Sequence, residues 1–267
     1  STQTVRAVVL APEKRNPQLR FFIEYFDEED KLQVMYGEPH CLEQGNNELA
    51  WEIPDTKGHA IFRLGIELTS KEGLTGYVVI KSLDWSNTPR AYKMGRSMEM
   101  TPSLTPWTTT TAWLKTFVSS ADHFNPDYTV TFSICHGQKN GVATTGTGDW
   151  KDYEVRSKIT FSQQEAAGLV ARAKGHRRYY GAVFTEGYAK IYKQKDEERI
   201  EIAKQSFPYE IDQTYDFCFR VKEDHLTLLV DGQEVVKGTD KEYPCGQAGF
   251  VVDRGAILGD TFKVEAV

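Results

Sequence analysis

Several features are scarce in this sequence of 267 residues, and each scarcity excludes a class of protein. The cysteines lie far apart and form no C-x-x-C pair, which argues against a zinc site. No apolar run approaches the ~20 residues of a membrane span. The formal net charge is -6, so no basic surplus points to nucleic acid. We therefore expect no nucleic-acid or membrane partner, and free thiols at Cys41, Cys135, Cys218 and Cys245.

Motifs that identify an active site are also absent. The sequence contains no G-x-S-x-G, no P-loop, no H-E-x-x-H and no dinucleotide-binding glycine pattern. Six histidines are scattered singly, whereas the ligands of a metal site must converge. We therefore expect no catalytic residues and no enzyme. A carboxylate pair for glycoside hydrolysis stays open, because such a pair is defined by its separation in space.

The pattern that is present is that of β-strands. Hydrophobic residues make up 40% of the chain and charged residues 26%, which is typical of a soluble globular protein. Segments rich in β-branched and aromatic residues recur, and several alternate apolar with polar residues, as strands do when one face packs on a core. The predicted strands are residues 19–26, 60–69, 76–84, 127–134, 153–161, 215–221 and 226–231.

Local signals refine this pattern. The clearest turn is Asp231-Gly232, which joins two strand patterns. Both central residues of a type I′ hairpin need positive φ, and Asp-Gly meets that need. Within residues 153–161 the alternation is interrupted at Ser157, which we interpret as a slip of register. One short helix is predicted, at residues 162–167.

Two segments lack a strand pattern, residues 87–111 and residues 137–148. Long irregular loops in compact proteins are usually functional or act as linkers. Strand patterns continue to the C-terminus after the second segment, so we place a domain junction there, which divides the chain into residues 1–145 and 146–267. Short strands at regular spacing, with Gly and Asn turns, predict an all-β fold of two tandem jelly-roll β-sandwiches.

The most informative candidates for ligand binding lie in residues 166–194. We interpret this segment as three antiparallel strands that present long polar and aromatic side chains on a shared face. The candidates are Arg172, Arg178, Tyr180, Lys190 and Tyr192. Aromatic rings stack on sugar rings, and guanidinium groups bind vicinal hydroxyls, carboxylates or phosphates. The alternative is an ordinary outer sheet face with exposed long side chains.

Tryptophans supply further candidates in the first half of the chain. Trp85, Trp107 and Trp113 are candidates for a platform on which a sugar ring stacks. Trp51 alternates with apolar residues, which favours a place in the core. Trp107 lies in the irregular segment, where it either faces the ligand or closes the end of the sandwich.

Several segments resemble a known arrangement of modules. In the second half they are GDWKDY (148–153), GLVAR (168–172), RRYY (177–180), GQAGFVV (246–252) and GDTFKV (259–264). In the first half they are LAWEIP (49–54), RLGIEL (63–68) and SLDWSNTP (82–89). Together they resemble the C-terminal accessory region of large bacterial proteins of the ADP-ribosylglycohydrolase family. That region consists of a galactose-binding-like jelly roll followed by a laminin-G/concanavalin A-like jelly roll.

The resemblance implies a function as well as a fold. It implies non-catalytic, carbohydrate-binding accessory modules of a larger glycoside or ADP-ribosylglycohydrolase-type hydrolase. The expected partners are a glycan or another polyhydroxylated ligand and a catalytic domain elsewhere in a longer parent chain. That parent determines whether the protein is cytoplasmic or secreted. Jelly-roll modules frequently hold a structural calcium ion, but no spacing in this sequence identifies its ligands.

Two alternatives from other functional classes stay open at this point. The first is a structural spacer or dimerisation module. The second is a jelly-roll glycosidase or lyase with its active site on a concave sheet face. In that second alternative, Tyr179, Tyr180 and Arg172 serve in proton transfer and charge neutralisation.

Overall fold

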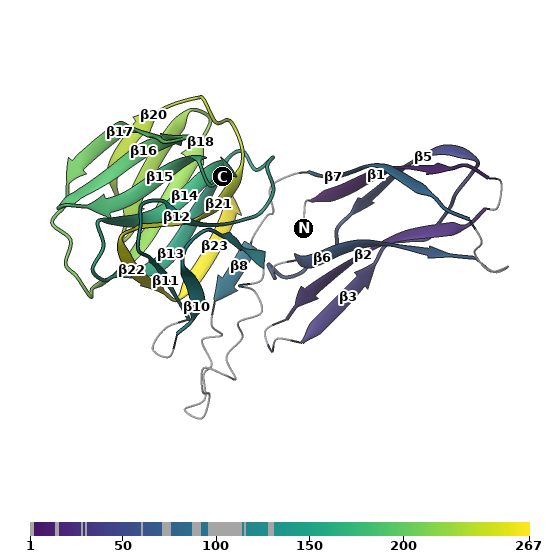
Figure 1. Cartoon of the computed structure of the whole chain (residues 1–267), viewed down its shortest axis with the longest axis horizontal. Coiled ribbons are helices and arrows are strands. Elements are labelled where there is room, and N and C mark those ends of the chain that lie inside the picture. The colour runs from purple at the N-terminus through teal and green to yellow at the C-terminus, as the bar shows by residue number, and fades with distance from the viewer. Residues whose placement is uncertain are drawn as a thin grey trace.

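The structure confirms the all-β prediction (Figure 1). The computed structural model describes residues 3–13, 16–27, 29, 31–59, 61–70, 76–86, 92–95, 114, 116–127 and 131–267. Its regular elements are 23 β-strands, which form two β-sandwiches. In these ranges no helix has the length and apolar character needed to cross a membrane.

The first sandwich consists of one three-stranded and one four-stranded sheet. The three-stranded sheet has the order β5 (Gly45–Glu52), β1 (Thr4–Ala11), β7 (Val79–Ser86). The four-stranded sheet contains β3 (Leu32–Tyr36), β2 (Gln18–Phe26), β4 (His40–Cys41) and β6 (Ile61–Thr69). In β1 every second residue is buried: Val5, Ala7, Val9 and Ala11. This period of two lets one face of the strand pack on the core while the other faces outward.

The second sandwich is larger, with sheets of nine and seven strands. The nine-stranded sheet contains β10 (His123–Pro126), β11 (Phe132–His136), β22 (Gly255–Gly259), β13 (Tyr153–Phe161), β18 (Thr214–Lys222), β19 (His225–Val230), β20 (Gln233–Thr239), β23 (Thr261–Ala266) and β8 (Tyr92–Gly95). The seven-stranded sheet has the order β17 (Glu198–Ser206), β16 (Tyr188–Lys195), β15 (Arg178–Thr185), β14 (Ala166–Gly175), β21 (Gln247–Asp253), β12 (Gly141–Thr145), β9 (Val118–Ser119).

The main core lies between these two sheets and is rich in aromatic rings. Phe184 packs on Phe161, Phe207 and Phe217, with ring centroids 4.8–4.9 Å apart. Aromatic pairs at this separation add stabilisation beyond the area that they bury. The same core contains the inward side chains of β13, whose alternation continues through Ser157. The predicted register slip there was wrong, because Ser157 occupies a buried position and its hydroxyl donates a hydrogen bond to the carbonyl of Thr261.

The sheet pairing corrects the predicted domain division at residues 145 and 146. Strands β9 and β12 belong to the seven-stranded sheet, and β8, β10 and β11 belong to the nine-stranded sheet. In particular, β12 pairs with β21 from Gly141↔Val252 to Thr145↔Ala248. The segment 137–148 therefore lies within the second sandwich. The prediction failed because pairing between strands over 100 residues apart leaves no local signal in the sequence.

Two local predictions had opposite outcomes. The Asp231-Gly232 hairpin is confirmed, with φ values of 51° and 78° in the turn between β19 and β20. The helix at residues 162–167 was wrong, since β14 begins at Ala166 and residues 162–165 are irregular. Strand β14 is buried on both faces, so its apolar run lacks the alternation that distinguishes a strand from a buried helix.

Candidate functional site

The seven-stranded sheet has a second apolar cluster on the face that points away from the main core. We call this surface the outer face. Its cluster consists of Val142, Ala166, Val170, Ala173, Tyr179, Val183, Tyr192 and Val251. In β15 the alternation is clear, because Tyr180 and Phe184 contribute to the main core while Tyr179 and Val183 contribute to the outer face. These side chains form a buried floor on which polar groups are arranged.

An ion pair crosses this floor from β17 to β21. Arg199 donates from Nη1 to Oδ2 of Asp253, and from Nη2 to Oδ1 at 3.3 Å. The Asp253 carboxylate is almost fully buried, and the backbone N–H of Asn140 also donates to its Oδ1 at 2.6 Å. A fork-to-fork pair of this kind fixes both partners in orientation. The guanidinium of Arg199 is therefore held in place on the outer face.

Two tyrosines lie beneath and beside this guanidinium. The Cζ of Arg199 lies 4.2 Å from the ring centroid of Tyr192, a cation–π contact. The hydroxyls of Tyr179 and Tyr192 are 3.3 Å apart, and Tyr179 donates to Oδ1 of Asn140. Burial raises the pKa of Tyr179 well above its usual range and that of Tyr192 to about 12. Both phenols are therefore protonated near neutral pH.

A second polar chain runs along the β12 side of the outer face. Thr144 Oγ1 donates to Oε1 of Gln247 at 3.1 Å and lies 3.3 Å from Nε2 of His176. The carbonyl of His176 accepts a hydrogen bond from Nδ2 of Asn140 at 2.8 Å, which connects this chain to the Arg199 pair. Burial lowers the pKa of His176, so its imidazole is neutral at physiological pH.

Charged side chains on β16 and β17 are the accessible part of this surface. The side chain of Arg199 is 28% exposed and that of Lys190 is 29% exposed, whereas the Asp253 side chain is only 2% exposed. Lys190 forms a 3.1 Å ion pair with Glu201 on β17. We define the outer-face site as Asn140, Thr144, His176, Tyr179, Lys190, Tyr192, Arg199, Glu201, Gln247 and Asp253.

Among the sequence candidates, Lys190 and Tyr192 lie in this site, and Tyr180 and Arg178 do not. The register of β15 and β16 pairs Gly181 with Tyr192 and Tyr180 with Lys193, so Tyr180 faces the main core. The prediction that these residues share one face was therefore wrong, because the alternation along β15 puts Arg178 and Tyr180 opposite to the Tyr192 face. Arg178 is exposed and forms an ion pair with Asp196 at 2.9 Å.

Tyr180 instead belongs to a network of hydrogen bonds and ion pairs that fixes the loop after β20. Its hydroxyl donates to Oδ1 of Asp240 at 2.6 Å and accepts the N–H of Tyr243 at 2.9 Å. Lys193 donates to Oδ2 of Asp240 at 2.6 Å and pairs with Glu242 at 2.8 Å. Although burial raises the pKa of Asp240, the hydrogen bonds from Lys193 and Tyr180 hold it below its usual value of 3.8.

Arg172 is also a structural residue and not an exposed ligand-binding group. Its residue exposure is 1%, and its φ of 50° breaks the pairing of β14, which shifts register between Ala171 and Gly175. The guanidinium donates to three backbone carbonyls: those of Lys151, Glu223 and Tyr243, at 3.0, 2.6 and 3.4 Å. It also pairs with Asp152 at 3.2 Å. The prediction failed because the left-handed conformation takes Arg172 out of the alternation.

The tryptophan candidates of the first sandwich do not join the outer-face site. Trp85 is half-buried and packs against the core of the first sandwich, with Nε1 buried. Trp107 and Trp113 lie outside the described residues. Trp51 stacks on Phe21, with ring centroids 6.3 Å apart, and contacts the same core, in agreement with the expectation for it.

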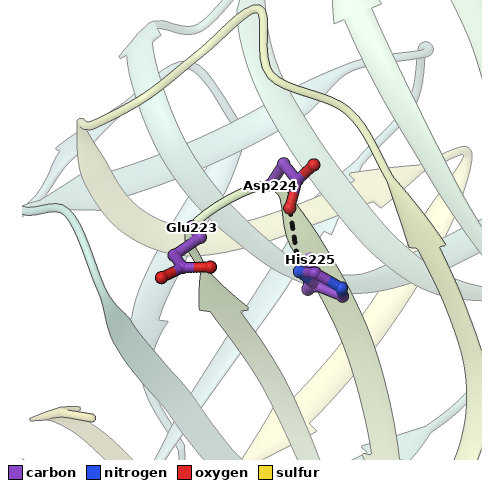
Figure 2. A group of neighbouring side chains, drawn as sticks. All are labelled: Glu223, Asp224 and His225. Carbon is purple, nitrogen blue, oxygen red and sulfur yellow. Dashed lines mark ion pairs between the residues drawn. The ribbon is translucent and has the colours of Figure 1, made fainter.

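Within the described ranges, one group of side chains has the donor set of a metal site (Figure 2). Glu223, Asp224 and His225 lie at the turn between β18 and β19, with ligand atoms within 4.8 Å of one another. They are consecutive and exposed, and Nδ1 of His225 lies 2.8 Å from Oδ1 of Asp224. Exposed acidic turns are common without an ion, so the expected structural calcium stays a prediction without identified ligands.

Sequence reasoning missed the central residues of the outer-face site. Asn140 lies in the glycine-rich segment that we interpreted as a linker, and Arg199 and Asp253 are 54 residues apart. Arg199 and Asp253 come to one face only through the successive pairing of β17, β16, β15, β14 and β21. The available signal was the Glu186-Gly187 turn, whose φ values of 48° and 79° set the hairpin register. A two-residue turn at these positions pairs Thr185 with Tyr188, and therefore Gly181 with Tyr192. Tyr192 then lies on the face opposite to Tyr180.

Comparisons with known proteins found solved structures with a similar fold but no relatives by sequence. No family model and no curated protein matches the chain. The carbohydrate-binding module CBM66 from Bacillus subtilis is 17% identical and aligns with 57% of this chain and 96% of that chain, with a TM-score of 0.52. A protein of unknown function with a galectin-like fold, also from Bacillus subtilis, is 10% identical over 59% and 92% of the two chains, with a TM-score of 0.46.

These likenesses bear on the fold. At such low identity, the similarity to CBM66 supports a β-sandwich of the jelly-roll kind and assigns no binding residue. The galectin LEC-6 from Caenorhabditis elegans, at 13% identity, aligns with 43% of this chain and 83% of that chain, with a TM-score of 0.36. By its name, CBM66 is a carbohydrate-binding module, and none of these neighbours supports an ADP-ribosylglycohydrolase parent.

Proposed function

We propose that the second sandwich binds a carbohydrate at the outer-face site. The observation that carries this proposal is the position of Arg199, which is accessible to solvent yet fixed by Asp253 and the Tyr192 ring. A preorganised planar donor loses little conformational entropy when it binds a ligand hydroxyl. The names of its structural neighbours, a carbohydrate-binding module and a galectin, support the same ligand class.

The chemistry of the remaining groups suits a polyhydroxylated ligand. Sugar hydroxyls both donate and accept hydrogen bonds, and the site offers donors on Arg199 and Lys190 and acceptors on Glu201 and Gln247. The exposed ring of Tyr188, at the start of β16 in the same sheet, is 41% accessible and can contact a sugar face. The rings of Tyr179 and Tyr192 are buried, so they support the site instead of stacking on the ligand.

The role of the whole chain is a wider proposal. The resemblance of the sequence to accessory modules supports a place beside a catalytic domain of a larger hydrolase, for which the sandwiches provide substrate attachment. A non-catalytic role agrees with the positions of Tyr179, Tyr180 and Arg172. All three are buried and hydrogen-bonded to protein groups, unlike residues that reach a substrate.

The proposal is tested by affinity electrophoresis of the whole chain in gels that contain single polysaccharides, followed by titration calorimetry on the best ligand. We expect retention on at least one polysaccharide. We expect Arg199→Ala and Lys190→Ala to weaken it by about tenfold each, because each removes charge-assisted hydrogen bonds to the ligand. Arg178→Ala is the matched control, since Arg178 is exposed but lies off the outer face.

Two results contradict the proposal. One is an absence of retention on every polysaccharide while circular dichroism shows the folded β-rich protein. The other is retention that Arg199→Ala and Lys190→Ala leave unchanged, which places the ligand elsewhere. Release of reducing ends from a retained polysaccharide favours the glycosidase or lyase alternative over a binding module.

A further inference from the structure

Two lysines on the outer face lie directly opposite each other across β16 and β17. The register of the two strands pairs Lys190 with Lys204. Both side chains belong to the outer face, because their strand neighbours Ile191 and Ala203 pack against the main core. Like charges directly opposite each other destabilise a strand pair. The arrangement is therefore unfavourable unless negative groups lie beside the lysines.

One carboxylate, that of Glu201, lies beside both lysines. Its Oε2 is 3.1 Å from Nζ of Lys190, and its Oε1 is 3.6 Å from Nζ of Lys204. The hydrogen bond from Lys190, together with the charges of both lysines, lowers the pKa of Glu201. The carboxylate is therefore ionised at neutral pH, but a single negative charge balances only one of the two lysines.

A β-bulge in β17 brings these three side chains to one face. Glu201 and Lys204 are three positions apart, and in a regular strand that spacing places two side chains on opposite faces. Here Tyr192 pairs with Glu201, whereas the residue before Tyr192 pairs with Ala203. The extra residue, Ile202, packs against the main core together with Ala203. Bulges often redirect a side chain next to a functional site.

An exposed aromatic ring adjoins the lysines. Tyr188 lies two positions before Lys190 on the same face and is 41% exposed. The Nζ of Lys204 is 5.5 Å from the centroid of this ring, and the Lys204 side chain is 52% exposed. Burial and the charge of Glu186 raise the pKa of Tyr209, which packs against the main core, so this acid of the β15–β16 turn acts towards that core. A sugar ring on Tyr188 thus has ammonium groups within reach.

The ion pairs in and beside the outer-face site have an excess of positive charge. Beside Asp253, the carboxylate of Glu165 is shared by Lys139 at 3.1 Å and Arg254 at 3.0 Å. Among the described residues, these pairs join five cations to three carboxylates, which are Lys139, Lys190, Arg199, Lys204 and Arg254 with Glu165, Glu201 and Asp253. The chain as a whole has a formal net charge of -6, so the excess is a local property of this face.

We propose that the ligand of the outer-face site is an acidic carbohydrate, whose carboxylate or sulfate group lies between Lys190 and Lys204. This inference rests on the proposed function and narrows its ligand class. A bound anion supplies the second negative charge that the lysine pair lacks. Hydrogen bonds between charged groups are about twice as strong as neutral ones, so an acidic sugar gains more from these donors than a neutral sugar.

The test is titration calorimetry of the full chain with three acidic glycans and their neutral counterparts. The pairs are oligogalacturonate and its methyl ester, sialyllactose and lactose, and sulfated dextran and dextran. We expect at least one acidic glycan to bind about tenfold more tightly than its counterpart, and the pair concerned distinguishes a carboxylate from a sulfate ligand. Because the attraction is between accessible charges, raising NaCl from about 50 to about 300 mM should weaken this binding several-fold.

Variants of the charged cluster locate the anion. We expect Lys204→Gln to weaken binding of the acidic glycan by about tenfold, because it removes a charge-assisted contact. Glu201→Gln should strengthen it about threefold, since the amide keeps an acceptor but no longer competes for the lysines. Lys237→Gln is the matched control, because its exposed ion pair with Glu234 lies on β20 of the other sheet. Its affinity should equal that of the wild type.

The outcomes separate this inference from the proposed function. Neutral glycans that bind as tightly as their acidic counterparts, or more tightly, overturn the inference and leave carbohydrate binding in place. So does binding of an acidic glycan that Lys204→Gln leaves unchanged or that Glu201→Gln weakens. An absence of binding to every glycan, acidic or neutral, contradicts the proposed function, and the inference fails with it.

Discussion

The ring of Tyr192 on β16 lies directly over Gly181 on β15, at paired positions of the two strands. A methyl group at position 181 would lie 2.4 Å from Cζ of this ring, well inside van der Waals contact. Position 181 therefore needs the smallest side chain so that Tyr192 can reach its place beneath Arg199. We expect Gly181→Ala to lower the free energy of unfolding by about 1–3 kcal/mol through overpacking.

The same substitution should also weaken glycan binding, because it displaces the ring that supports the guanidinium. Urea unfolding measures the first effect and titration calorimetry the second. Gly148→Ala is the control, since position 148 has open space around it and its backbone is not left-handed. Equal stabilities for the wild type and Gly181→Ala would contradict the close approach of the ring.

Arg172 allows a second prediction, on stability alone. Arg172→Met keeps the apolar stem but removes the donors to the carbonyls of Lys151, Glu223 and Tyr243. Unsatisfied buried acceptors and the loss of a buried charge are costly, so we expect the free energy of unfolding to fall by about 3 kcal/mol. Chemical denaturation monitored by circular dichroism measures it.

The comparison for Arg172→Met is Arg178→Met, which removes an exposed ion pair with Asp196. Exposed ion pairs contribute little to folding stability, so the free energy of unfolding of this variant should fall by less than about 1 kcal/mol. If the free energy of unfolding falls equally in the two variants, the hydrogen bonds from Arg172 to the carbonyls of Lys151, Glu223 and Tyr243 do not stabilise the fold as the structure indicates.

Features determined by neighbouring residues could be predicted from the sequence. The Asp231-Gly232 turn follows from the backbone preferences of two residues, and the strand at 153–161 matches the observed β13. The fold class follows from the repetition of such signals along the chain. Lys190 and Tyr192 were placed on one strand face because alternation within a strand is also local.

Features determined by distant pairing could not be predicted. The joining of Arg199 to Asp253 requires the order of five strands, from β17 to β21, which no local pattern encodes. Arg172 shows a second limit, because a single left-handed residue reverses which face the following positions occupy. Arginine has no preference for that conformation, so the sequence does not predict it. The same applies to β8, β11 and β12, which pair with β23, β22 and β21 far along the chain.

Asp240 predicts how stability depends on pH. Its folded-state pKa lies below 3.8, so its contribution to stability is complete above that value and is lost as the pH falls through the folded-state pKa. Asp240→Asn should lower the free energy of unfolding by about 1–2 kcal/mol at pH 7, after allowance for solvent screening. The difference between the wild type and this variant should shrink towards pH 2.

Urea unfolding at pH 7, 4 and 2 measures this dependence. Asp231→Asn is a suitable control, because Asp231 is an exposed carboxylate at a hairpin turn. A stability difference for Asp240→Asn that is as large at pH 2 as at pH 7 would show that Lys193 and Tyr180 do not stabilise the charged form of the carboxylate.

The outer-face site predicts a glycan affinity that is flat between pH 7 and pH 9. Burial holds the pKa of Tyr179 well above its usual range and that of Tyr192 at about 12, so neither phenol ionises in this interval. The pKa of Arg199 is also raised, despite partial burial, by the neighbouring Tyr192 and Asp253. The guanidinium of Arg199 and the two phenols therefore keep their protonation states in this interval.

Below this interval, His176 determines the expected change. Its pKa is lowered from 6.5 by burial, so protonation begins only below that pH and places a charge beside Thr144 and the apolar floor. We expect affinity to fall as the pH drops from 6.5 to 5, and His176→Gln to remove that fall, since its amide does not titrate there. Titration calorimetry at pH 5, 7 and 9 measures both. An equal loss of affinity at low pH in His176→Gln would assign the effect to a different group.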